Sequence, residues 1–190
     1  MGECEAAGPH GELPRPPFSY EELLEAALDW GCNCGPSALA AIVQCTLGEA
    51  REALTGFDER RYTNPTMMNE ALRNLGVPFK NIHPVWPNWG LVRIQWEGPW
   101  TKPGVPMAAR YRFTHWVGTA LGADGGRGIF DCNAMANGTG WCAFQDWNAV
   151  IVPYILADNP RAYGTWHVTH CLSVPLRVSA SSREMGSAGA

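Results

Sequence analysis

Apolar residues recur at helical spacing over the first third of the chain. From Tyr20 to Trp30 they lie three and four positions apart, which predicts an amphipathic helix. Ser19 and Glu22 form a capping box at its start, because each side chain can accept a hydrogen bond from the other residue's free N–H. Ala38, Leu39, Ile42 and Val43 also recur at helical spacing, so the run from Pro36 to about Leu47 predicts a buried helix that ends near Gly48.

Shorter elements are expected over the next 35 residues. Glu49 to Leu54 suits a short helix, whereas Thr55 to Pro65 holds Gly, Asp, Asn and Pro and is typical of a loop. Thr66 is expected to cap a third helix that runs through Leu75. A strand is expected over Val77 to Ile82.

The period of the apolar positions then changes to two. Val92, Ile94 and Trp96 alternate with polar residues, which predicts a strand with one buried face. Arg110 to Leu121 alternates in the same way. A glycine-rich turn joins it to Gly128 to Asp131, so these two segments are expected to form an antiparallel hairpin.

The last third of the chain mixes loop, helix and strand patterns. Asn133 to Gly140 is expected to be a loop, and Tyr163 to Val178 a final strand. Phe144 to about Val152 favours a short helix, although Ala149 to Ile155 also suits a buried strand. Helices come first and strands later, without regular alternation, so the predicted fold class is α+β.

Composition indicates one folded domain. The chain has 190 residues, of which 46% are hydrophobic and 17% charged, as in globular proteins. We expect this domain to span residues 18–178. A flexible lead-in over residues 1–17 would precede it, and a disordered tail over residues 179–190 would follow, because both segments are rich in proline or small polar residues.

Charge and cysteine usage exclude several classes of partner. The net charge is −4 and the longest basic run is Arg60-Arg61, so nucleic-acid binding is not expected. No apolar run approaches the roughly 20 residues of a membrane span, so no membrane association is expected. The odd number of cysteines, seven, and the absence of a signal-like N-terminus predict a cytoplasmic protein with free thiols.

Cys34 is the strongest candidate for chemistry. It directly precedes Gly35 and Pro36, and proline suits the first position of a helix. Cys34 would then lie at the positive end of the helix dipole, facing backbone N–H groups that stabilise a thiolate. A cysteine nucleophile also needs a base and a group that orients the base. His115 on the long strand and Asp131 at the end of the next strand are expected to meet across the hairpin.

The segment N-C-G-P-S-A-L-A-A-I resembles the nucleophile segment of papain-like cysteine peptidases, and most closely that of the subgroup related to bacteriocin leader peptidases. The resemblance implies a papain-like fold, in which a helical half carrying Cys34 packs on an antiparallel sheet carrying His115 and Asp131. It also implies a peptide or protein substrate, a thioester intermediate, and no cofactor or metal.

The chain departs from the family at two points. Cys132 follows the acid where the subgroup usually has proline, so Asn133 is an alternative orienting group. The glutamine that normally contributes to the oxyanion hole is missing, because Leu28 and Asp29 occupy its positions. The Asn33 side chain is expected to replace it, beside the Cys34 backbone N–H.

Other functions remain open on the same residues. An acyltransferase would use the same thioester, and a catalytically inactive scaffold would bind a protein partner. A zinc site could be assembled from His115 with Cys32, Cys34, Cys132 and Cys142, but the chain contains no Cys-x-x-Cys pair. The tryptophan-rich segment from Trp86 to Trp100 and Gly118 are expected to border a peptide groove.

Overall fold

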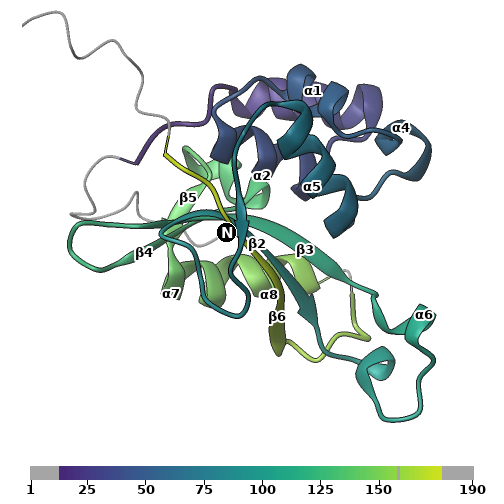
Figure 1. Ribbon diagram of the computed structural model, residues 1–190. Coiled ribbons are helices and arrows are strands. Elements are labelled where there is room, and N and C mark those ends of the chain that lie inside the picture. The colour runs from purple at the N-terminus through teal and green to yellow at the C-terminus, as the bar shows by residue number, and fades with distance from the viewer. Residues whose placement is uncertain (1–12, 158, 177–190) are drawn as a thin grey trace, which may run out of the picture.

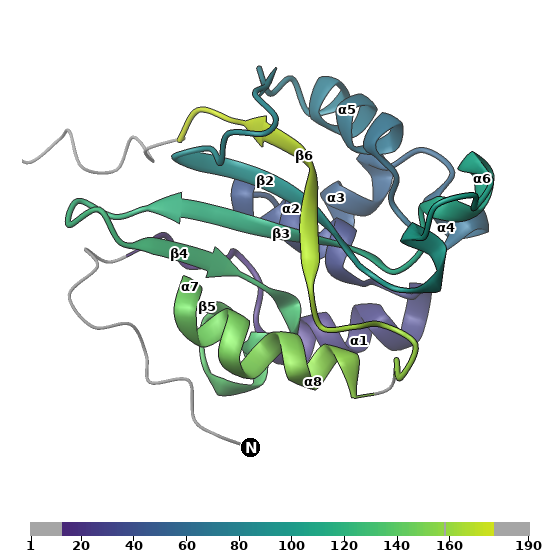
Figure 2. The ribbon, with the colours of Figure 1, turned by 90° about the horizontal axis from the view of Figure 1, so that it is seen from below.

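The protein is a twisted antiparallel sheet with helices on both faces (Figures 1 and 2). A computed structural model describes residues 13–157 and 159–176. The first helical layer holds α1 (Tyr20–Trp30), α2 (Cys34–Val43), α3 (Leu47–Ala53), α4 (Phe57–Arg60) and α5 (Pro65–Asn74). It covers one face of the sheet, and helices from the second half of the chain cover the other (Figure 1).

The strands of the described residues form one six-stranded sheet in the order β1-β6-β2-β3-β4-β5. Their bounds are β1 (Lys80–Asn81), β2 (Trp89–Trp96), β3 (Thr114–Leu121), β4 (Arg127–Phe130), β5 (Trp141–Ala143) and β6 (Trp166–Ser173). Neighbouring strands pair antiparallel throughout. The α+β class predicted from the sequence is confirmed.

Short helices complete the chain. The connection from β2 to β3 contains the 3-10 helix η1 (Pro99–Thr101) and α6 (Met107–Arg110). Between β4 and β6 lie the 3-10 helix η2 (Cys132–Asn137) and a continuous helical segment built from α7 (Phe144–Asp146), the π-helix η3 (Trp147–Ile151) and α8 (Val152–Leu156). This segment covers the second face of the sheet (Figure 2).

Residues of β2 and β3 alternate between two hydrophobic cores. Leu91 and Trp116 face the first helical layer, whereas Val92, Ile94 and Val117 face η3 and α8. Every residue of β2 is therefore buried. The expectation that this strand has a polar, exposed face is wrong, because the sheet is covered on both sides.

The first helix is confirmed, and the later helices begin earlier than expected. Both hydrogen bonds of the predicted capping box at Ser19 are present. α2 begins at Cys34 and ends at Val43, because Asn33 caps it and Gln44 adopts a left-handed conformation. α5 is capped by Asn64 instead of Thr66, and the expected loop before it contains α4.

Several strands are shorter than expected, although the β3–β4 hairpin is confirmed. The segment at residues 77–82 keeps only two residues of strand, β1, and β6 ends at Ser173. β3 begins at Thr114 because Phe113 has a positive φ of 51°, which interrupts the extended backbone.

Three further expectations have mixed outcomes. The helical alternative for residues 144–152 is right and the strand alternative is wrong. Residues 133–140 contain η2 where a loop was expected. Part of the expected lead-in is packed, because the Pro14 carbonyl accepts a hydrogen bond from Trp141 Nε1 at 3.0 Å. Residues 1–12 and the expected tail lie outside the described residues.

No described helix has the length and apolar character that a membrane crossing requires.

Candidate active site

Cys34 is the first residue of α2, and its position is fixed by the residues beside it. The Asn33 side chain caps the helix by accepting a hydrogen bond from the Gly35 N–H at 3.2 Å. A Cβ atom on Gly35 would lie 2.2 Å from Thr63 Oγ1, so only glycine allows this close approach. The Thr63 segment cannot retreat freely, because its carbonyl accepts a 2.9 Å hydrogen bond from Trp116 Nε1.

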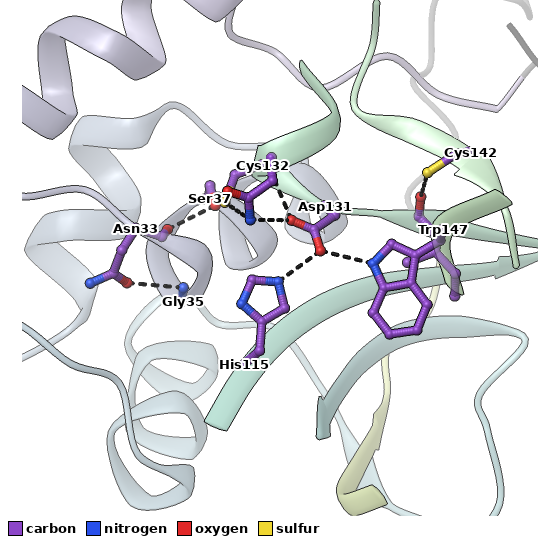
Figure 3. Close-up of polar contacts among 10 residues, drawn as sticks. Asn33, Gly35, Ser37, His115, Asp131, Cys132, Cys142 and Trp147 are labelled. Carbon is purple, nitrogen blue, oxygen red and sulfur yellow. Dashed lines mark hydrogen bonds and ion pairs between the residues drawn. The ribbon is translucent and has the colours of Figure 1, made fainter. Parts of the chain in front are cut away.

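His115 and Asp131 are in direct contact (Figure 3). Nε2 of His115 lies 2.7 Å from Oδ2 of Asp131, and both side chains are almost completely buried. β3 pairs with β4 only from Gly118 onward, so the chain leaves β4 beside the start of β3 and delivers Asp131 to His115. The contact predicted from the hairpin is present.

Asp131 accepts hydrogen bonds from three side chains and one backbone N–H (Figure 3). Oδ2 accepts from Trp147 Nε1 at 2.8 Å in addition to its contact with His115. Oδ1 accepts from the Asn133 backbone N–H at 3.0 Å and from Asn133 Nδ2 at 2.8 Å. Asn133 therefore holds Asp131, and Asp131 is the residue that contacts the imidazole.

Cys34 is in hydrogen-bond contact with His115. Because Nε2 of the ring is hydrogen-bonded to Asp131, Nδ1 is the ring nitrogen available to the thiol. Burial raises the pKa of the Cys34 thiol, but the charge and hydrogen bond of His115 outweigh it. The Trp116 backbone N–H also donates to the sulfur, so the pKa of Cys34 is lowered.

The partners of Cys34 are shifted in the directions that an ion pair requires. Burial alone would lower the pKa of His115, but the charges of Asp131 and Cys34 raise it well above its usual value. Burial would raise the pKa of Asp131, but its attraction to His115 and its hydrogen bonds lower it to about 2. These shifts all act in favour of a thiolate at Cys34, an imidazolium at His115 and a carboxylate at Asp131.

Two further thiols border the site and have the opposite character. Burial and the nearby charge of Cys34 raise the pKa of the Cys32 thiol to about 12. Burial and the charges of Asp131 and Cys34 raise the pKa of Cys132 well above its usual value. Cys34 is thus the thiol that ionises most readily in this cluster.

The zinc alternative lacks its ligand geometry. Cys142 lies on β5, where its sulfur hydrogen-bonds the Ile129 carbonyl at 3.7 Å. Within residues 13–157 and 159–176, no three His, Cys, Asp or Glu side chains are arranged to hold a metal ion.

The proposed side-chain donor of the oxyanion hole is engaged elsewhere. The Asn33 Oδ1 atom caps α2, and its Nδ2 donates to the Arg61 carbonyl at 3.1 Å. The Cys34 N–H lies in the first turn of α2, where backbone donors have no acceptor within the helix, so no helical carbonyl competes with an oxyanion for it.

Two residues that contribute to the site were not predicted from the sequence. Trp147 donates to Asp131 from the first residue of η3, although its helical spacing indicated only a core position. Arg93 is a buried residue of β2, and Thr114 and Thr169 accept its hydrogen bonds. Burial lowers the pKa of Arg93, and attraction to the Cys34 thiolate counteracts this, so Arg93 adds positive charge near the nucleophile.

The residues expected to border a peptide groove lie elsewhere. Trp100 is buried, stacks on Phe113 and donates to the Trp96 carbonyl at 2.8 Å. Trp86 packs against Phe144 on the second face of the sheet. Gly118 permits close packing of α2, since a Cβ there would lie 2.9 Å from Ile42 Cδ1.

Comparisons of the chain with protein-family models and with curated proteins found no match. What the site can do therefore follows from its own geometry and chemistry.

Proposed function

We propose that this protein is a papain-like cysteine hydrolase that cleaves peptide or related amide bonds. One observation carries the proposal: His115 interacts with both a carboxylate and a thiol at a helix N-terminus, with Nε2 2.7 Å from Asp131 Oδ2 and Cys34 coupled to the ring by charge and a hydrogen bond. A nucleophile, a base and an orienting acid in contact are the requirements of covalent acyl transfer.

The reaction follows from these positions. The Cys34 thiolate attacks the carbonyl carbon, and the Cys34 N–H donates to the oxygen as it becomes negative. The His115 imidazolium then gives its proton to the leaving amine, which leaves a thioester on Cys34. Neutral His115 next takes a proton from water, whose oxygen attacks the thioester and releases the acid. Asp131 keeps the ring oriented through both steps.

The test uses a peptide mixture in water enriched in ¹⁸O, with products identified by mass spectrometry. The wild-type protein should produce new C-termini that carry one ¹⁸O atom, whereas Cys34→Ala should produce none. Cys45→Ala removes a cysteine just beyond the other end of α2 and should retain full activity. New products without ¹⁸O that appear only when an amine is added would make the protein an acyltransferase.

A binding protein on the same scaffold is the second candidate. The observation that favours it is the engagement of both Asn33 side-chain atoms, which leaves no second donor identified for the oxyanion. A missing donor typically costs about 10²–10³ in rate. Absence of any Cys34-dependent product across the mixture, together with partner binding that survives in Cys34→Ala, would establish this candidate.

A further inference from the structure

A groove of about 690 Å³ opens beside Cys34 and His115. This volume lies within the range of sites that bind small ligands or side chains. Two helical segments that are distant in sequence supply its walls, α1 from one side and η3 with α8 from the other. The wall residues are Leu23, Leu24, Ala27, Val150, Ile151 and Tyr154.

The two walls of the groove contain no charged side chains. Its lining includes no Asp, Glu, Lys or Arg, and apart from the cysteines and His115 its ionisable groups are tyrosines. Away from Cys34 and His115, which face each other, a charged substrate group that entered the groove would lose water without gaining an opposite charge. An apolar group would instead be removed from water against the aliphatic side chains of both walls.

Large apolar side chains remain exposed at this position. Leu24 is 45% exposed and Tyr154 is 56% exposed, and both line the groove. Single exposed apolar residues are ordinary on protein surfaces. Here they gather around a nucleophile, and the groove is continuous with the sulfur that a substrate must reach, so the occupant is a part of the substrate.

We infer that the groove selects substrates that carry a large apolar or aromatic side chain next to the bond that Cys34 attacks. Leu24 and Tyr154, the exposed large side chains of its two walls, are the specificity-determining residues. The inference rests on the proposed function, since it concerns the substrate of the same site. Burial of one large apolar side chain corresponds to a preference of about 10- to 100-fold over a substrate that lacks it.

The test requires a reactive Cys34 but no turnover. Alkylation of Cys34 is timed at pH 7 by peptide mass spectrometry with iodoacetamide and with its N-hexyl, N-benzyl and N-(5-carboxypentyl) derivatives, each normalised to its rate with glutathione. The hexyl and benzyl reagents should react at least about tenfold faster than iodoacetamide. The carboxypentyl reagent, which ends in a carboxylate, should show no such gain.

Two surface positions of α1 provide the matched variants. Leu24→Glu places a charge in the groove and should abolish the advantage of the apolar reagents. Leu28→Glu is the control, because Leu28 is 89% exposed on the same helix and does not line the groove. Leu24→Lys should instead favour the carboxypentyl reagent. Such a reversal would show that the variant is folded and that the groove, not general thiol reactivity, determines the relative alkylation rates of the reagents.

The outcomes separate this inference from the proposed function. Equal normalised rates for all four reagents, or equal effects of Leu24→Glu and Leu28→Glu, would overturn the inference even if the protein hydrolyses peptides. Selective alkylation in a protein that hydrolyses nothing would support the groove and contradict the hydrolase. Occupation of the groove by this chain itself or by a second copy would appear as uniformly slow alkylation, which also overturns the inference.

Discussion

Trp147 Nε1 donates a 2.8 Å hydrogen bond to the same Asp131 oxygen that holds His115. The other oxygen of this buried carboxylate accepts two hydrogen bonds from Asn133, one from its backbone N–H and one from its side chain. Four donors around one carboxylate explain why it stays ionised in the interior. They also limit which substitutions the position can accept.

Asp131→Asn should reduce activity by about 10²–10³-fold. The carboxylate accepts hydrogen bonds on both oxygens, whereas the amide accepts only on its single oxygen and donates from its nitrogen. Its NH₂ group must face either Asn133 or the pair formed by His115 and Trp147. The rate of peptide cleavage measures the loss. Addition of Asn133→Asp supplies an acceptor for the new NH₂ group and should restore part of the activity. A double variant as slow as the single one would contradict this explanation.

Trp147→Phe should raise the pKa of Asp131 above about 2, because one charge-assisted hydrogen bond is removed. We also expect a loss of about 1.5–3 kcal/mol in the free energy of unfolding, measured with denaturant at pH 7. Trp116→Phe is the matched control, since that indole is equally buried but donates to the neutral Thr63 carbonyl. The two variants should differ in acid sensitivity. Identical acid transitions would argue against a role for the Trp147 N–H in holding the carboxylate.

Stability should fall as the pH is lowered from about 4 to about 2. The pKa of Asp131 in the folded protein, about 2, lies below its ordinary value of 3.8, so the unfolded chain binds the proton more readily. The resulting stabilisation, about 2 kcal/mol, is present above pH 4 and is lost as the folded carboxyl titrates. Asp131→Asn should remove most of this dependence. Asp58→Asn, which affects an exposed ion pair with Arg51, should leave it nearly unchanged.

Gly35→Ala should destabilise the protein by about 1–3 kcal/mol and slow alkylation of Cys34, because the new methyl group overlaps Thr63 at the start of α2. Gly48→Ala is the control within a neighbouring helix. Its Cβ would come no closer than 3.9 Å to Thr46 Oγ1, so this substitution should stabilise α3 slightly. Unchanged Cys34 reactivity in Gly35→Ala would mean that the contact with Thr63 does not position the nucleophile.

The contacts that the sequence predicted are local or lie on neighbouring strands. Cys34 could be placed because glycine and proline mark the start of a helix, and His115 could be paired with Asp131 because a hairpin brings their strands together. The helix was nevertheless predicted to begin two residues late, which hid the capping role of Asn33. Asparagine is a favoured N-cap residue, so this signal was present in the sequence.

The missed features depend on contacts between distant segments. The spacing of Trp147 indicates a buried helical residue, but nothing in its neighbourhood shows that its N–H reaches a carboxylate 16 residues earlier. The walls of the groove are formed by α1 and by η3 with α8, which lie more than 115 residues apart in the chain. Arg93 looked exposed because strand periodicity assigns alternate residues to solvent, whereas this sheet is covered on both faces.

Alkylation of Cys34 by iodoacetamide as a function of pH, compared between the wild-type protein and His115→Ala, tests the central claim most directly. The lowered pKa of Cys34 and the raised pKa of His115 predict rapid alkylation well below pH 7 in the wild-type protein. In His115→Ala only the Trp116 N–H and the positive charge of Arg93 still oppose the effect of burial, so the pKa of Cys34 should rise towards the ordinary thiol value of about 8.5 or above. If Cys34 reacts only above pH 8.5, at the same rate in both proteins, no thiolate–imidazolium pair exists and the hydrolase account is contradicted.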